Sequence, residues 1–220
     1  MAMHRVRSGQ TTESLAASRR LYWKTVWEHP KNEGLRAKRK DPNLLHEGDE
    51  IFLPDVEPRD ETCETTRRHT FKVRGIPSKL QVRFLDLNGE PRADEPYELL
   101  VDGTMSAGPT TTRGSLDGDG WVRANIHPTA TRAVIRVGDP ESSSFEEHVL
   151  MVGVLDPIDE LSGVCDRLHN LGYFEGSRAA DPADARLREA IARFRGDEGL
   201  APSEVVDDEL CDALKARHGG

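Results

Sequence analysis

The sequence predicts an α+β protein made of three small units: a β-α-α-β unit, an antiparallel β-sandwich and a C-terminal three-helix bundle. The hydrophobic period indicates this division, because apolar residues recur with helical spacing near both ends of the chain and alternate in its middle. A polar stretch without any period separates the first two units. We therefore expect the units at 1–56, 71–155 and 156–220, with a linker at 57–70.

Composition excludes several classes of protein. The chain carries 30 Lys and Arg against 39 Asp and Glu, a formal net charge of −9. We expect no nucleic acid partner, because phosphate backbones are bound through basic patches. No apolar run is long enough to cross a bilayer, so no membrane insertion is expected.

The start of the chain and its cysteines predict a compartment. The first residues lack the apolar core of a secretory signal peptide. The 3 cysteines have spacings that fit neither a metal knuckle nor a disulfide framework. We therefore expect reduced cysteines in a chain that folds in the cytoplasm.

The first unit begins with a turn and a helix cap and ends in a strand. Gly9 suits a turn conformation that other residues resist. Thr11 or Thr12 can cap the helix that follows. The closing segment, 43–54, reads Asn-Leu-Leu-His-Glu-Gly-Asp-Glu-Ile-Phe-Leu-Pro.

These segments together resemble a LysM domain, and 43–54 is their most specific match. LysM domains are β-α-α-β modules that bind chains containing N-acetylglucosamine in a shallow groove between two loops. The resemblance implies a ligand-binding groove lined by Gly9, Gln10, Thr11, Asn43, Leu44 and Leu45.

The first unit departs from LysM domains at two places. Gln10 stands where the turn usually carries an acid, and the helical region 22–40 is longer and more basic than in compact members. Trp23 and Trp27, four residues apart, suit either a core anchor or a sugar-stacking platform, and we favour the core. Sugar binding by the groove and a retained fold used for protein contact both stay open.

The middle unit alternates apolar and polar residues and is punctuated by Asn-Gly and Asp-Gly turns. It resembles small Ig-like or transthyretin-like sandwiches of bacterial surface and secretion proteins. The segment 117–120, Asp-Gly-Asp-Gly, suggests a calcium loop. Further acids are missing at the positions that such a loop needs, so we favour a hairpin turn.

The last unit shows three apolar sets at helical spacing. Their members are Leu161, Val164, Cys165 and Leu168, then Leu187, Ala190, Ile191 and Phe194, then Leu210, Ala213 and Leu214. Gly172, within Leu-Gly-Tyr, is expected to end the first helix in the left-handed conformation.

This unit resembles the peptidoglycan-binding three-helix domain found beside many cell-wall hydrolases. Its apolar positions match that family, but its turn positions do not: 176–184 replaces a glycine-rich turn, Arg195 replaces a glutamine, and 203–207 replaces a second glycine turn. The pattern preserves a fold and leaves the ligand site of the family in doubt.

No motif in the sequence assembles reactive groups. Nucleotide-binding glycine loops, nucleophile elbows and zinc-protease motifs are all missing. The 8 histidines are scattered, and the acidic pairs fall at expected element ends. We expect no enzyme, and therefore no catalytic residues, no metal and no cofactor.

The order of the three units resembles small LysM/peptidoglycan-binding-like proteins encoded with contractile injection or type VI secretion systems. The resemblance implies a non-catalytic modular adaptor or structural component whose partners are proteins of the injection machine. The alternative is a peptidoglycan-binding protein that uses the LysM-like groove, and a secreted effector with hidden activity is a third hypothesis. The missing signal peptide favours the adaptor, since a cytoplasmic chain would reach the wall only if the machine exported it.

Overall fold

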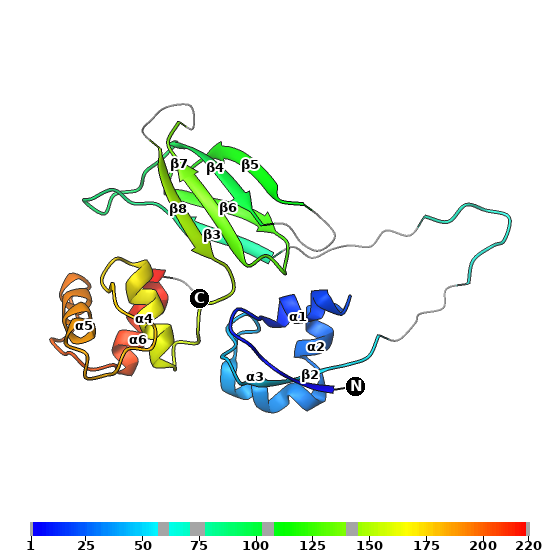
Figure 1. Ribbon diagram of the computed structural model, residues 1–220, viewed down its shortest axis with the longest axis horizontal. Helices are drawn as coiled ribbons and strands as arrows, with labels where there is room; N and C mark the ends of the chain where they lie inside the picture. Colours follow the sequence, from blue (N-terminus) through cyan, green and yellow to red (C-terminus); the bar gives the residue numbers. More distant parts are fainter. Residues whose placement is uncertain (1, 57–61, 71–77, 103–107, 140–144, 219–220) are drawn as a thin grey trace.

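The computed structural model describes residues 2–56, 62–70, 78–102, 108–139 and 145–218 (Figure 1). These residues form six α-helices, one 3₁₀-helix and eight strands. All paired strands among them run antiparallel. The α+β class that the sequence predicts is therefore confirmed. No helix among the described residues combines the length and the apolar character needed to cross a lipid bilayer.

Residues 2–53 form the first group of elements. They are β1 (Ala2–Arg5), α1 (Thr12–Ser18), α2 (Trp23–Trp27), η1 (Pro30–Asn32), α3 (Glu33–Arg39) and β2 (Glu50–Leu53). The helical region expected over 22–40 is divided into short pieces, with Pro30 opening the 3₁₀-helix. Asn32 joins these pieces to β2, because its buried amide bonds the carbonyl of Val26 at 2.7 Å and both backbone groups of Phe52 at 2.7 and 2.9 Å.

The two tryptophans differ in depth. Trp27 is buried in the apolar cluster of this first group, and Trp23 packs against the same cluster while partly exposed. The core interpretation is therefore confirmed for Trp27, and Trp23 lies at the margin of the core.

The middle of the chain forms two facing sheets. Its strands are β3 (Ser78–Arg83), β4 (Pro96–Val101), β5 (Thr110–Ser115), β6 (Trp121–Ile126), β7 (Arg132–Val137) and β8 (Glu146–Met151). One sheet is β3–β6 and the other has the order β5-β4-β7-β8. Alternate residues of both sheets, such as Leu99, Val122 and Ile135, are buried together between them.

The segment 117–120 is a tight turn but not a hairpin, so that part of the expectation is wrong. It links β5 to β6, and these strands belong to different sheets. The Asp117 carboxylate accepts the amides of Asp119 and Trp121 at 3.0 and 2.9 Å and also binds Arg123. Its oxygens thus stabilise the corner between the sheets.

The last part of the chain is helical, with α4 (Leu161–Asn170), α5 (Ala185–Asp197) and α6 (Asp208–His218). Gly172 has a φ of 81° and ends α4 as expected. The buried Arg195 binds Asp207 and Glu209, and donates to the Ala201 carbonyl at 2.9 Å. Arg195 thus holds the connection between α5 and α6.

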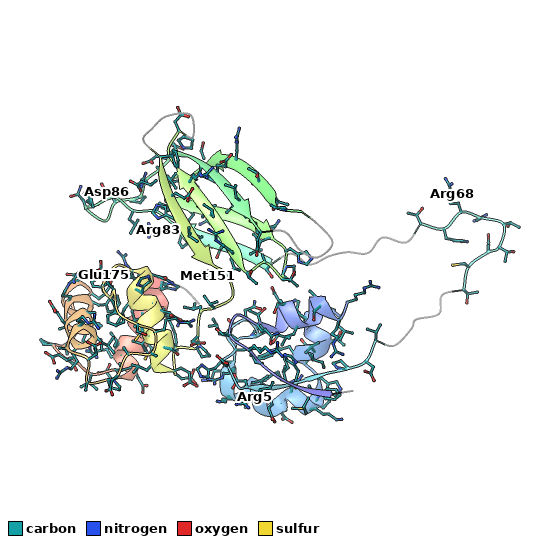
Figure 2. The ribbon with its side chains drawn as sticks, in the orientation of Figure 1. Arg5, Arg68, Arg83, Asp86, Met151 and Glu175 are labelled. Atoms are coloured by element: carbon teal, nitrogen blue, oxygen red, sulfur yellow. The ribbon has the colours of Figure 1, made fainter. Side chains whose placement is uncertain are left out.

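The residues 62–70 of the expected linker are all exposed and contain no helix or strand. Figure 1 shows them in cyan, far from the helices and sheets, and Figure 2 labels Arg68 among them. The remainder of the expected linker, 57–61, and the first residues of the expected sandwich, 71–77, lie outside the described residues.

Substituting Phe194 by alanine tests the core of the last unit. Phe194 is 0% exposed within the helical cluster. We expect Phe194→Ala to lower the free energy of unfolding by about 3–5 kcal/mol, as large-to-small changes in a core do. Val205→Ala, at a side chain that is 65% exposed, is the control and should change the free energy of unfolding little. Equal urea-unfolding curves for the two variants would contradict the assignment.

Candidate functional site

The two segments expected to line a groove lie side by side. The turn 9–11 precedes α1, and the loop 43–45 precedes β2. The amide of Thr12 donates to the carbonyl of Pro42 at 3.0 Å, which joins the ends of the two segments. We call the turn 9–11 and the loop 43–46 the groove lips.

Side chains of the first lip stabilise their own turn. Gly9 has a φ of 80°, which only glycine adopts without strain. The Gln10 side-chain oxygen accepts the amide of Arg7 at 3.0 Å and lies 2.8 Å from Nε2 of His4. The hydroxyl of Thr11 caps α1 by accepting the amide of Ser14 at 3.0 Å. The amide oxygen of Gln10 thus accepts a backbone N–H of its own turn.

The second lip is only partly accessible. Asn43 is exposed and Leu44 is half-buried, while Leu45 belongs to the apolar core. The Asp41 carboxylate accepts the amide of Asn43 at 2.7 Å and fixes the start of the loop. Among the six expected lining residues, only Asn43 is exposed, Leu45 is buried and the other four are half-buried.

A stretch of the chain itself lies against both lips. This docking segment, residues 152–160, connects β8 to α4. A Cβ on Gly9 would lie 3.5 Å from Cγ1 of Val154, and a Cβ on Gly153 would lie 3.1 Å from the carbonyl oxygen of Gly9. Asp156 reaches the other lip, where its Oδ1 is 3.5 Å from Nδ1 of His46. Glycine at 9 and at 153 allows the two backbones to approach this closely.

Arg39, at the end of α3, is the centre of the contact. Its guanidinium binds both oxygens of Asp49, at 2.7 and 3.1 Å, within the first unit. It also binds Asp159 at 3.1 Å and Glu160 at 2.8 Å, both in the docking segment. Its side chain is fully buried, so the three carboxylates replace the water that a cation needs.

Charges around Arg39 shift the pKa values of the pair. Burial works to raise the pKa of Asp49, but hydrogen bonds from Arg39 and from the amide of His46 outweigh it and lower the pKa below its ordinary value. Burial likewise works to lower the pKa of Arg39, and the bonds to Asp49 and Glu160 raise it instead. Both groups are therefore held in their charged forms at neutral pH.

The helical unit holds the docking segment from its other side. The buried Arg167 of α4 donates to the carbonyl of Asp156 at 2.9 Å. Arg178 binds the carbonyl of Val154, Asp166 at 2.6 Å and Asp156 at 3.1 Å. Arg178 lies in the connection between α4 and α5.

Periodicity and motif spacing did not single out Arg39, Asp49 and the acids of the docking segment as a site. Their signal was a basic run at 36–40 matched by an acidic run at 156–160. Within the described ranges, no group of three or more His, Cys, Asp or Glu side chains could hold a metal ion. The arrangement that is present holds a segment of the chain through ion pairs and close glycine contacts.

Comparisons of this chain with protein-family models, with curated proteins and with solved structures gave no match.

Asp49→Asn tests the pairing with Arg39. Removing one partner of a buried ion pair costs about 3–5 kcal/mol, and we expect the lower end, since Asp159 and Glu160 stay beside Arg39. A lowered pKa stabilises the folded chain above the ordinary aspartate value of about 3.9, and this contribution disappears as the pH falls through the lowered pKa. We therefore expect the free energy of unfolding, measured with urea, to fall less between pH 7 and pH 3 in Asp49→Asn than in the parent.

The acids of the docking segment are tested by cutting the exposed linker. After cleavage within 62–70, we expect the two fragments of the parent chain to co-elute in size-exclusion chromatography, because Arg39 holds the docking segment. In Asp159→Asn combined with Glu160→Gln, the fragments should separate. Glu189→Gln combined with Asp212→Asn removes equal charge from exposed helix positions and should leave them together. Co-elution in every variant would contradict the role of the two acids.

Proposed function

We propose that the chain is a non-catalytic modular adaptor or structural component of a contractile injection or type VI secretion-like machine. It would act through protein contacts made by a LysM-like unit, an Ig/transthyretin-like sandwich and a peptidoglycan-binding-like three-helix unit. Three separate apolar clusters support this layout, within 6–53, 80–152 and 158–214. They fall inside the boundaries expected from the hydrophobic period.

One observation carries the proposal of protein contact: the groove lips bind polypeptide. The turn 9–11 contacts Gly153 and Val154, and the loop at His46 reaches Asp156. A glycan would have to compete with this segment for the first lip. The face that LysM domains use for sugar is therefore suited in this chain to a peptide segment flanked by acids.

The assignment to an injection machine rests on the order of the three units along the chain. The protein surface available for partners includes scattered large apolar side chains, among them Tyr22, Leu87 and Val205. A structural piece of an assembly needs such contacts and requires no reaction.

Peptidoglycan binding is the second candidate, and the accessibility of Asn43 and Leu44 favours it. A sugar chain could use the second lip alone, or both lips after the docking segment leaves. The two candidates differ in what the docking segment covers. In the peptidoglycan-binding candidate its removal would expose a sugar site, and in the adaptor candidate it would expose a site for a protein partner.

Sedimentation with insoluble peptidoglycan distinguishes them. We expect the full chain, and equally the Asp159→Asn/Glu160→Gln variant, to stay in the supernatant. In parallel, affinity purification of the tagged chain from its own cells should recover injection-machine proteins. The adaptor proposal would be contradicted if the full chain pelleted strongly and the double variant Asn43→Ala with Leu44→Ala bound peptidoglycan about tenfold more weakly, a change of about 1.4 kcal/mol. That result would support the peptidoglycan-binding candidate. Asn125→Ala, at an exposed position on β6, is the matched control.

A further inference from the structure

Strand β8 forms one edge of the four-stranded sheet and is paired on one side. It pairs with β7 from Glu146 to Met151, and no other described strand pairs with it. Val149 is 51% and Met151 60% exposed, although apolar residues of the neighbouring β7, such as Ile135, are buried. Figure 1 shows β8 at the margin of this sheet, and Figure 2 labels Met151 at its end.

The hydrogen-bond register shows which backbone groups of β8 face outward. The amide of Val152 donates to the carbonyl of Thr131 at 2.9 Å, in line with the register that places Met151 opposite Arg132. Antiparallel pairs alternate between bonded and non-bonded positions. The backbone groups of the even-numbered residues of β8 therefore face β7, and those of Glu147, Val149 and Met151 face away from it.

The same three residues place their side chains on the outer face of the sheet. The register aligns Leu100, Val134 and Val149 into an apolar row that crosses β4, β7 and β8. Because Val149 ends this row at the free edge, the row is open to extension by another strand.

A row of charges runs beside the apolar row. Arg113 and Arg136 bind Glu98 at 2.8 and 3.3 Å, and Arg136 also binds Glu147 at 2.8 Å. Each carboxylate in this row already has a cation. The charge of Glu147 at the edge is therefore compensated by Arg136. An added strand is not repelled as long as it places no acid opposite Glu147.

We propose that β8 pairs with β8 of a second copy of this chain, antiparallel and with Val149 on the two-fold axis. The outward backbone groups of the two edges then bond each other, and the two apolar rows join into one across an eight-stranded sheet. This inference concerns the sandwich alone and does not depend on the proposed adaptor function.

The charges favour this register over its neighbour. With Val149 on the axis, Glu147 lies opposite Met151 of the second copy, and Arg132 of that copy follows in the same row. With Glu147 on the axis, two glutamates would face each other, which destabilises a strand pair. The opposite edge of the sheet, β5, exposes Thr110, Thr111 and Thr112 and offers no comparable apolar row.

The molar mass of the full chain in solution tests the proposal. We expect light scattering and sedimentation velocity to show the mass of two chains in the high micromolar range and of one chain on dilution. Val149→Lys should raise the dissociation constant by about tenfold or more, because lysine at a free edge blocks strand addition. Val149→Pro removes an outward N–H that β7 does not use, so it should block pairing while the strand stays in place.

Two matched controls accompany these variants. Val149→Ile keeps the β-branched apolar side chain and should keep the dimer, and Val205→Lys adds the same charge at an exposed residue between α5 and α6. Circular dichroism of every variant confirms that the fold is retained. A parent chain with the mass of one chain at all concentrations, or a dimer that both Val149→Lys and Val149→Pro leave unchanged, would overturn the proposal.

Discussion

The placement of the first and last units depends on compensation of one buried cation. The guanidinium of Arg39 lies out of contact with water, where an isolated charge is unstable. Asp49 supplies two oxygens from the same unit, and Asp159 and Glu160 supply the others from 120 residues and more along the chain. The docking segment must lie where these acids reach Arg39. The close approach of Gly153 to Gly9 and of Asp156 to His46 follows the same placement.

Arginines perform a similar task elsewhere in the helical unit. Arg167, fully buried, donates to the carbonyls of Asp156 and Gly163, and Arg195 holds the connection between α5 and α6. Burial lowers the pKa of Arg167. Bonds from a planar cation to backbone oxygens can replace a glycine turn as the means of fixing a loop. Arg167 and Arg195 fix the loops of the helical unit in this way.

Periodicity predicted the parts of the fold that local packing determines. The apolar faces around Leu168, Ile191 and Leu210 are buried as expected, and Gly172 ends its helix in the left-handed conformation. The sequence did not predict which sheet each strand joins, because that depends on pairing between distant segments, and the 117–120 turn was taken for a hairpin for this reason. The turn 9–11 and the loop 43–46 lie side by side, and the sequence did not predict the docking segment that contacts them. Ion pairs between residues 39 and 160 leave no periodic signal in a chain with charges along most of its length.

The sandwich lies in the chain between two units that contact each other. The first unit contacts residues 152–160, which precede the helical unit, so the first and last units are in contact with each other. The chain between them, which contains the sandwich, therefore leaves this pair of units and returns to it. The sandwich is in this sense an insertion between two parts of the chain that meet at Arg39. Inserted domains can be exchanged without rebuilding the host when the host's own contacts close around the insertion point. The sandwich is thus the part of this protein that evolution or design could replace with a different module, while the first and last units keep each other in position.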